Sequence, residues 1–148
     1  MLIKNGFVFC DDFAVREGDV YTELDRISEP QSQQEVLDAT GCIVVPGFID
    51  IHIHGANGTD FCDSTREAHA NIARYLASVG VTSYLGTTMA MKKPVLLNMV
   101  RSANEFMDNP VEDGAVMRGI NLEGPFAAVE KKGAMDPNNL IDPDYDFF

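Results

Sequence analysis

The most chemically specific part of this sequence is a run in which two histidines alternate with isoleucines. Residues 48–55 are Phe-Ile-Asp-Ile-His-Ile-His-Gly. Successive side chains of a strand point to opposite faces, so Asp50, His52 and His54 share one face and the isoleucines share the other. Two imidazoles side by side at the end of a strand offer the paired nitrogen donors that a divalent metal such as Zn²⁺ requires. We therefore predict that His52 and His54 are metal ligands.

An exposed strand with a solvated polar face would show the same alternation. The surrounding sequence favours metal ligation, because the run lies in a parallel α/β pattern, described below, whose strands are normally covered on both faces. Imidazoles and a carboxylate that face inward are costly unless they bind something.

Glu123 is predicted as a third ligand. It closes the run Ile-Asn-Leu-Glu at residues 120–123, directly before Gly124 and Pro125. A carboxylate at the C-terminal tip of a parallel strand lies where α/β folds build their sites. On its own, a glutamate before a Gly-Pro turn is usually a solvated loop residue, but together with the histidine pair it completes a three-donor set.

The elements that must position these residues alternate between strand and helix. Strands are predicted at 48–54, 81–88 and 116–123, and this order is typical of a parallel α/β sheet. The first helix is predicted to start at Ser-Thr-Arg-Glu (64–67), which matches a capping box, and to end at Gly80. The second is predicted to begin near Pro94 and to stop at Asn109-Pro110. His69 falls inside the first helix among polar neighbours, so we expect it at the surface rather than as a ligand.

The first 45 residues are predicted to form short strands and turns. Residues 2–9 are apolar and contain Asn5-Gly6, which indicates a hairpin. A polar loop is expected at 29–34 and a second hairpin at 36–45, ending at Pro46-Gly47. We therefore place a domain boundary between 1–46 and 47–148. Residues 48–148 have room for about three strand–helix units at roughly 30 residues each, and we expect the fold to continue beyond the last residue.

Composition excludes several classes of function. The 148 residues include 23 acidic and 11 basic side chains, which gives a formal net charge of −12. A nucleic-acid surface would need clustered Lys and Arg, and an anionic membrane would repel this chain. The N-terminus lacks the pattern of a signal peptide, and no apolar stretch approaches the roughly 20 residues of a membrane helix. Cys10, Cys42 and Cys62 are odd in number and lack CxxC spacing, which indicates reduced thiols and a cytoplasmic protein.

Three motifs carry a resemblance to a known family. PGFIDIHIHG at 46–55 resembles the first barrel strand of the metal-dependent amidohydrolase superfamily. INLEGPF at 120–126 and KKGAMDP at 131–137 are more specific, and together they resemble the N-acetylglucosamine-6-phosphate deacetylase family. The resemblance covers essentially the whole chain.

The resemblance implies a fold and a set of site residues. The fold would be α/β: part of a small β-domain at 1–46, followed at 47–148 by the N-terminal portion of a (β/α)₈ barrel, which takes roughly 250 residues when complete. Glu123 would be the central metal ligand, and His52 and His54 would supply a second metal position. Ala134 and Met135 match a substrate-contacting segment, in which many relatives carry His at the position of Met135.

The resemblance also implies an activity: hydrolysis of the acetamide of N-acetylglucosamine 6-phosphate to glucosamine 6-phosphate and acetate by a metal-activated water, with one or two ions, zinc foremost. The family's general acid/base Asp is expected downstream, so no catalytic residue is expected in this chain and the chain alone should be inactive. The substrate would be a small amino-sugar phosphate. The full-length enzyme would be a homodimer, whereas an open sheet edge should make this chain prone to association.

Two alternatives remain open from the sequence. Another amidohydrolase, such as a cyclic amidase of the dihydropyrimidinase or hydantoinase type, would also use a His-x-His motif, although such enzymes typically recruit a carboxylated Lys where this chain offers Glu123. The other alternative is a non-enzymatic α/β module that binds a metal or a partner.

Overall fold

The computed structural model describes residues 1–24, 26–30 and 35–147. Of the loop predicted at 29–34, residues 31–34 lie outside the described residues. The chain divides into two compact units, Met1–Pro46 and Gly47–Phe148. Each unit has its own sheet and is described by itself.

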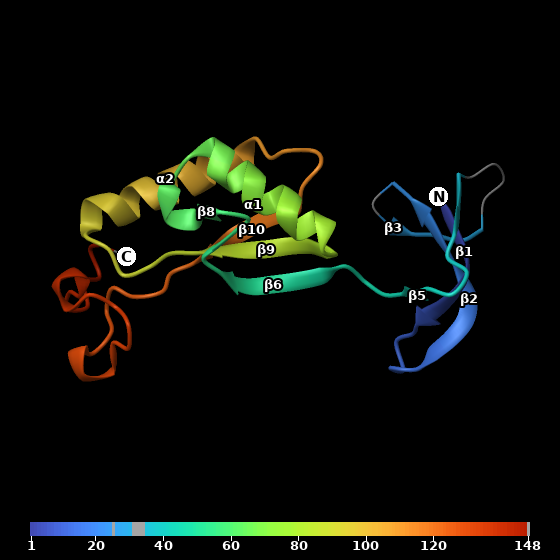
Figure 1. The fold of residues 1–148 in the computed structure, drawn as a ribbon, viewed down its shortest axis with the longest axis horizontal. Helices are drawn as coiled ribbons and strands as arrows, with labels where there is room; N and C mark the ends of the chain where they lie inside the picture. Colours follow the sequence, from blue (N-terminus) through green and yellow to red (C-terminus); the bar gives the residue numbers. More distant parts are fainter. Residues whose placement is uncertain (25, 31–34, 148) are drawn as a thin grey trace. The chain divides into compact units, whose positions relative to one another are not determined.

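Unit 1 is a five-stranded sheet built around its first strand (Figure 1). β1 (Leu2–Phe9) pairs antiparallel with β2 (Val15–Glu23), which in turn pairs with β3 (Arg26–Ile27). On its other side β1 pairs in parallel with β4 (Val36–Asp38) and with β5 (Ile43–Val44). All five strands therefore depend, directly or through β2, on β1.

Both hairpins predicted in this unit are wrong. β1 runs straight through Asn5-Gly6, where the register against β2 shifts and only Asn5 of the two has a positive φ, of 62°. A tight hairpin turn of the favoured type needs positive φ at both central residues, so a single left-handed residue makes an irregularity within the strand instead of a turn. The predicted second hairpin separates into β4 and β5, because each pairs with β1.

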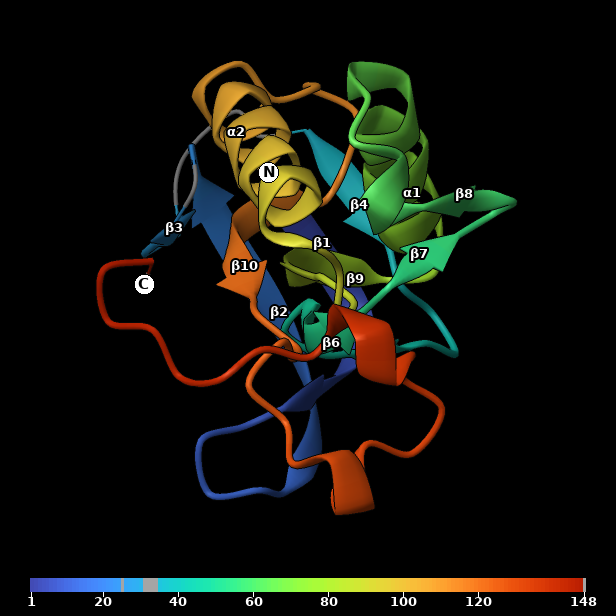
Figure 2. The same cartoon turned by 90° about the vertical axis from the view of Figure 1, so that its left-hand side faces the viewer.

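Unit 2 is an α/β layer with three parallel strands, and this part of the prediction is confirmed. β6 (Phe48–Ile53), β9 (Val81–Thr87) and β10 (Val116–Asn121) form a sheet in the order β10-β9-β6. Two helices, α1 (Arg66–Ser78) and α2 (Lys93–Asp108), lie side by side on one face of this sheet (Figures 1 and 2). Within the described residues neither helix has the length and apolarity that crossing a membrane would need.

The third expected strand–helix unit is incomplete in the described part of the chain. β10 is followed by two short 3₁₀ turns, η2 (Val129–Lys131) and η3 (Pro137–Asn139), rather than by a helix, and the three parallel strands form an open sheet rather than a closed barrel. A small two-stranded ribbon, β7 (Gly55–Ala56) and β8 (Thr59–Asp60), follows β6 and leads into the 3₁₀ turn η1 (Phe61–Asp63).

The first helix begins one residue later than predicted. Thr65 is the N-cap of α1, and its hydroxyl accepts the Ala68 N–H at 3.1 Å. Ser64 instead ends η1 with a φ of 53°, and the reciprocal capping box belongs to Asp60 and Asp63 of that turn. Two short elements compete for the same residues. Asp60 caps η1 and Ser64 ends it, so Thr65 is the next residue whose hydroxyl can cap the helix.

The core of unit 2 lies between the helices and the sheet. Its fully buried side chains include Ile72 from α1, Leu96, Met99 and Phe106 from α2, and Tyr84 from β9. These positions follow the helical spacing expected for one apolar face. The buried side chains of the described part of unit 2 therefore gather on the face of the sheet that the helices cover.

The surface position predicted for His69 is wrong. The residue is 0% exposed, and its ring packs against Phe61 and Phe106, with centroids 5.1 and 5.5 Å away. Its Nε2 lies 2.9 Å from Ser102 Oγ, whereas Nδ1 has no partner among the described residues. His69 lies on the face of α1 that packs against α2. Its polar neighbours in the sequence lie on other faces of the helix, so they did not indicate that His69 is buried.

The buried position of His69 predicts a loss of stability in mild acid. Burial lowers the pKa of His69 from its ordinary value of 6.5, and the attraction of Asp63 opposes this only in part. Below about pH 6.5 the unfolded chain therefore binds a proton that the folded chain does not, and the free energy of unfolding decreases as the pH falls. Denaturant titrations between pH 5 and 7.5 should show this slope, and His69→Gln should flatten it. An equal slope in both proteins would contradict the assignment.

The outer strand of the sheet exposes isoleucines. Ile49 is 70% and Ile51 66% exposed, because β6 is an edge strand of the described sheet. The assumption that this strand is covered on both faces is therefore wrong for this chain, and the cost of burial does not by itself argue for a metal at the histidine pair.

We predict concentration-dependent association of this chain through β6. An edge strand with free backbone groups and large apolar side chains is a template for pairing with another chain. The double variant Ile49→Lys, Ile51→Lys should lower the association measured by sedimentation velocity, whereas Val95→Lys on α2, a position 42% exposed, serves as a matched control. Association unchanged in the double variant would show that another surface is responsible.

Candidate metal centre

The three predicted ligands come from two strands that are not neighbours in the sheet. His52 belongs to β6, His54 follows it, and Glu123 comes two residues after β10. β9 lies between these strands, and its paired residues align their ends: Ile53 is opposite Gly86, and Asn121 is opposite Thr87. Because the strands are parallel, all three side chains emerge at the carboxyl edge of the sheet.

The donor atoms of these side chains converge on one point. Glu123 Oε2 lies 2.9 Å from His52 Nε2 and 3.1 Å from His54 Nε2. The two Nε2 atoms are 3.3 Å apart, and the rings stand nearly perpendicular at 85°. The side chains are partly open to solvent, with exposed fractions of 51%, 37% and 34% for His52, His54 and Glu123. An ion could reach this cluster and contact all three residues.

The spacing of the donors fits a small divalent cation. Zn²⁺ binds nitrogen and carboxylate oxygen at about 2.0–2.2 Å, so donors at tetrahedral angles lie about 3.3–3.6 Å apart. The separations here, 2.9, 3.1 and 3.3 Å, are at or a little below the short end of that range. The set of two imidazoles and one carboxylate also suits zinc or a similar transition metal rather than calcium or magnesium, which prefer oxygen. His52, His54 and Glu123 therefore fit the divalent metal ion that the sequence implies.

Hydrogen bonds among the three side chains explain their close approach less completely than a bound cation does. Glu123 Oε2 can accept a hydrogen from each Nε2, but then the two donor nitrogens face one another at 3.3 Å without a hydrogen bond between them. His54 Nδ1 is buried and has no partner among the described residues, and this holds whether Nε2 faces the carboxylate or an ion. A cation would be attracted to all three donors at once.

Asn121 holds the first histidine of the pair. Its Nδ2 lies 3.1 Å from the Ile51 carbonyl oxygen and 3.2 Å from His52 Nδ1. A metal bond at Nε2 places the ring hydrogen on Nδ1, so Asn121 can support the metal-bound ring only by presenting its Oδ1, after a turn of the amide. Asn121 thus contacts His52 from two strands away.

The loop after Glu123 requires glycine at its first position. Gly124 has a φ of +70°, and a Cβ there would lie 2.7 Å from the Cβ of Ala90. Both the left-handed backbone and the close approach exclude larger residues. The peptide bond between Gly124 and Pro125 is cis. The turn sends the chain across the carboxyl end of the sheet, where the segment after β10 lies in Figure 1.

Ala134 and Met135 border a hollow next to the cluster. The hollow has a volume of about 430 Å³ and is lined by His54, Glu123, Met89, Ala90 and residues 131–135. Lys132 shapes this segment, because its Nζ donates to the Met135 carbonyl at 2.8 Å and lies 3.3 Å from that of Gly133. The structure therefore brings all five predicted site residues to one region.

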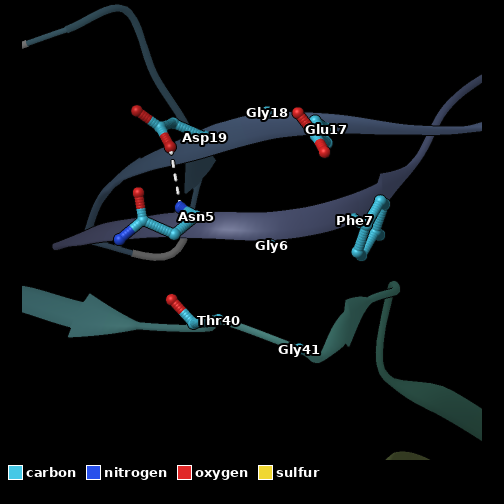
Figure 3. A pocket seen from close by; sticks show the side chains of 8 residues that line it. All are labelled: Asn5, Gly6, Phe7, Glu17, Gly18, Asp19, Thr40 and Gly41. Atoms are coloured by element: carbon cyan, nitrogen blue, oxygen red, sulfur yellow. Dashed lines mark hydrogen bonds between the residues drawn. The ribbon is translucent and has the colours of Figure 1, made fainter.

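A second hollow, of about 570 Å³, lies in unit 1 and contains none of the predicted residues (Figure 3). It is lined by Asn5, Glu17, Asp19 and Thr40 along with Phe7 and glycines, and the Asn5 N–H donates to Asp19 Oδ1 at 3.1 Å. Its lining offers no imidazole or thiol, so this hollow contains none of the donors predicted from the sequence.

Cys62 does not belong to the donor set. Burial raises the pKa of the Cys62 thiol to about 11, so the thiol stays protonated near neutral pH. Within the part of the chain that the structure describes, the group of three or more donors that could hold an ion consists of His52, His54 and Glu123.

Comparisons with known proteins agree with these motifs. No family model matches the sequence. The chain is 32% identical over 145 residues to an N-acetylglucosamine-6-phosphate deacetylase of Bacillus subtilis, covering 96% of this chain and 35% of that protein. The solved deacetylase of Thermotoga maritima superimposes with a TM-score of 0.81 at 26% identity, covering 99% of this chain and 38% of the other. The chain is homologous to the N-acetylglucosamine-6-phosphate deacetylases.

A further solved structure in this family contains a ligand. A variant of the Mycobacterium smegmatis deacetylase was determined in complex with N-acetyl-D-glucosamine-6-phosphate; it is 27% identical to this chain, with a TM-score of 0.81 and coverage of 99% of this chain and 38% of that one. A Bacillus D-hydantoinase reaches a TM-score of 0.50 over 87% of this chain. The fold similarity is therefore greater to the deacetylases than to the cyclic amidase. The chain spans about a third of the length of the curated relatives it matches.

Sequence reasoning missed three residues that support the cluster. Asn121 lies within the INLEGPF motif, two residues before Glu123, and the alternation of a strand could have placed both on one face. Thr87 and Thr88, at the end of β9, bond the backbone at Ile53 and Glu123. Nothing in the local sequence marks these two threonines, since their partners depend on strand pairing.

We predict that this chain binds Zn²⁺ or Co²⁺ through the cluster. Replacing one ligand, as in His52→Ala, His54→Ala or Glu123→Gln, should weaken binding by on the order of 100-fold or more, because three donors share the charge of the ion. Competition with a chromophoric chelator gives the dissociation constant. Asp50→Asn is the matched control, since Asn keeps an oxygen that can accept the His52 N–H, as Asp50 does at 3.0 Å, and the residue lies outside the donor set. Equal affinity in the wild type and all ligand variants would contradict the site.

Proposed function

We propose that this chain supplies the metal centre and part of the substrate pocket of an N-acetylglucosamine-6-phosphate deacetylase. The reaction would hydrolyse the acetamide of N-acetylglucosamine 6-phosphate to give glucosamine 6-phosphate and acetate. The observation that carries this proposal is the convergence of His52, His54 and Glu123 beside the hollow bordered by residues 131–135, in a chain similar to these deacetylases over nearly its whole length.

The fold supports the same proposal. Residues 47–148 would form the N-terminal portion of a (β/α)₈ barrel, and residues 1–46 would be part of a small β-domain. The supporting observations are the parallel order of β6, β9 and β10, the two helices on one face, and the similarity to solved deacetylases. In such a barrel the active site lies at the carboxyl end of the strands, which is where the three donors emerge here.

The residues of this chain would bind the ion and shape the pocket. His52, His54 and Glu123 would hold a divalent metal, zinc by the chemistry of the donors, and the carboxylate would offset part of its charge. When bound, such an ion lowers the pKa of a coordinated water to about 7 and polarises a carbonyl oxygen. Asn121, whose amide lies 3.2 Å from His52 Nδ1, would orient His52 through its Oδ1 after a turn of the amide, because an outer acceptor fixes the ring of a metal-binding histidine.

The segment at 131–135 would contact the substrate. Ala134 and Met135 line the same hollow as Glu123, and Lys132 supports this segment through the Met135 carbonyl. Met135 would pack against the sugar with an apolar side chain, since a thioether is at most a weak hydrogen-bond acceptor. Lys131 and Lys132 place positive charge at the pocket, which would offset locally the net charge of −12 for an anionic sugar phosphate.

The group that transfers the proton to the leaving amine would come from outside this chain. General acid–base catalysis requires a titratable group within hydrogen-bond reach of the reacting atoms. The described donors around the hollow are already committed to the proposed ion.

We further propose that the full-length enzyme is a cytoplasmic homodimer. The three cysteines within this chain are free thiols, as a reducing compartment would allow.

We predict that the isolated chain releases no acetate from N-acetylglucosamine 6-phosphate, even with Zn²⁺, because the proton-transfer group is missing. A chimera in which this chain replaces the corresponding part of the Bacillus subtilis relative should release acetate. Glu123→Gln in that chimera should lower kcat/KM by about 100-fold or more, since the ion would lose its carboxylate ligand. Acetate is measured enzymatically, and circular dichroism checks that each protein is folded.

The same proteins separate the alternatives. Dihydrouracil, a cyclic amide, should not be turned over by the chimera, and turnover of this substrate without deacetylation would favour a cyclic amidase. Acetate release by the isolated chain would overturn the proposal that catalysis needs residues outside it. If the chimera does not fold, the remaining part of the relative can be mixed with this chain as a separate polypeptide, and activity should depend on both.

A further inference from the structure

Two adjacent buried threonines end the strand that separates the histidines from the glutamate. Thr87 is the last residue of β9, Thr88 follows it, and both are 0% exposed. Neither side chain belongs to the donor set. A buried hydroxyl is costly without hydrogen bonds, so the partners of these two groups show what they do.

The Thr87 hydroxyl holds the histidine strand. Its Oγ1 accepts the N–H of Ile53 at 3.0 Å, and Ile53 lies between His52 and His54 in the sequence. The register between β6 and β9 is irregular from Asp50 to Ile53, so the backbone ladder is disturbed just before the two ligands. The hydroxyl serves as the acceptor for the Ile53 N–H at this irregularity.

The Thr88 hydroxyl holds the glutamate. Its Oγ1 accepts the N–H of Glu123 at 3.1 Å and lies 3.5 Å from the Glu123 carbonyl oxygen. The Thr88 N–H donates to the Asn121 carbonyl at 3.0 Å. Glu123 is two residues beyond the end of β10, where ladder pairing has stopped. A side chain of the neighbouring strand therefore continues the pairing as far as the ligand.

We propose that Thr87 and Thr88 are positioning residues that set the separation between the histidine pair and Glu123. The Thr87 hydroxyl fixes the backbone of β6 at Ile53, and the Thr88 hydroxyl fixes the backbone at Glu123. Because the two threonines are adjacent, their hydroxyls together set the distance between the histidine pair and Glu123. A metal site loses affinity when its ligands are displaced by more than about 0.5 Å, and groups that hold ligands typically contribute 10- to 100-fold in affinity. The proposal rests on the metal centre proposed above.

The test removes each hydroxyl while keeping the shape of the side chain. Thr87→Val and Thr88→Val should each weaken Zn²⁺ binding by about tenfold and alter the visible absorption bands of the Co²⁺-loaded chain, because the donor geometry relaxes. Thr88→Ser keeps the hydroxyl and should restore both. Thr82→Val is the matched control, since Thr82 lies at the other end of β9 and its Oγ1 is 3.4 Å from the Phe48 carbonyl oxygen.

The outcomes distinguish this role from the metal centre itself. Absence of Zn²⁺ and Co²⁺ binding by the wild-type chain would refute the centre and the positioning role together. Unchanged affinity and Co²⁺ bands in both valine variants, with binding lost in Glu123→Gln, would refute the positioning role alone. Denaturant unfolding of the metal-free proteins checks for loss of stability; if a valine variant is unfolded, Thr88→Ala and Thr88→Ser are compared under the same measurements.

Discussion

The candidate site depends on the parallel pairing of three strands. Its donors come from β6 and from the residues after β10, and β9 between them supplies none. The separation of about two strand spacings, roughly 10 Å between backbones, is bridged by side chains that lean over β9 from both sides. A shift of register in either pairing would turn the donors to the other face of the sheet or move them apart. The convergence of the candidate donors therefore depends on the backbone pairing of the strands, to which the donor side chains themselves do not contribute.

The packed core and the candidate site occupy different parts of the sheet in unit 2. The helices and buried residues such as Tyr84, Leu96 and Phe106 cover one face and hold the strands in place. The carboxyl edge is left to His52 and Glu123 and to the loops that surround them. This arrangement is expected for α/β folds, where packing against helices fixes the sheet and the strand ends remain free to vary. His69 belongs to the packed side, so its burial concerns stability rather than metal binding.

The similarity to deacetylases and the geometry of the site support each other in different ways. Similarity extends over nearly the whole chain but over only about a third of the relatives. Within this third, the geometry brings together three candidate metal donors and part of the lining of a hollow. β6 is an edge strand of the described sheet, and its exposed Ile49 and Ile51 make this edge a template for pairing with another strand.

The sequence by itself determined the features that depend on local patterns. The alternation around His52 and His54, the apolar faces of both helices and the Gly-Pro turn after Glu123 are readable because each is set by neighbours within a few residues. Tertiary structure decided the rest. Asn5 became an irregularity in a strand, His69 became buried, and Thr87 and Thr88 gained partners on other strands. Strand pairing joins residues far apart in the chain, so no local pattern could specify which hydroxyl would hold which ligand.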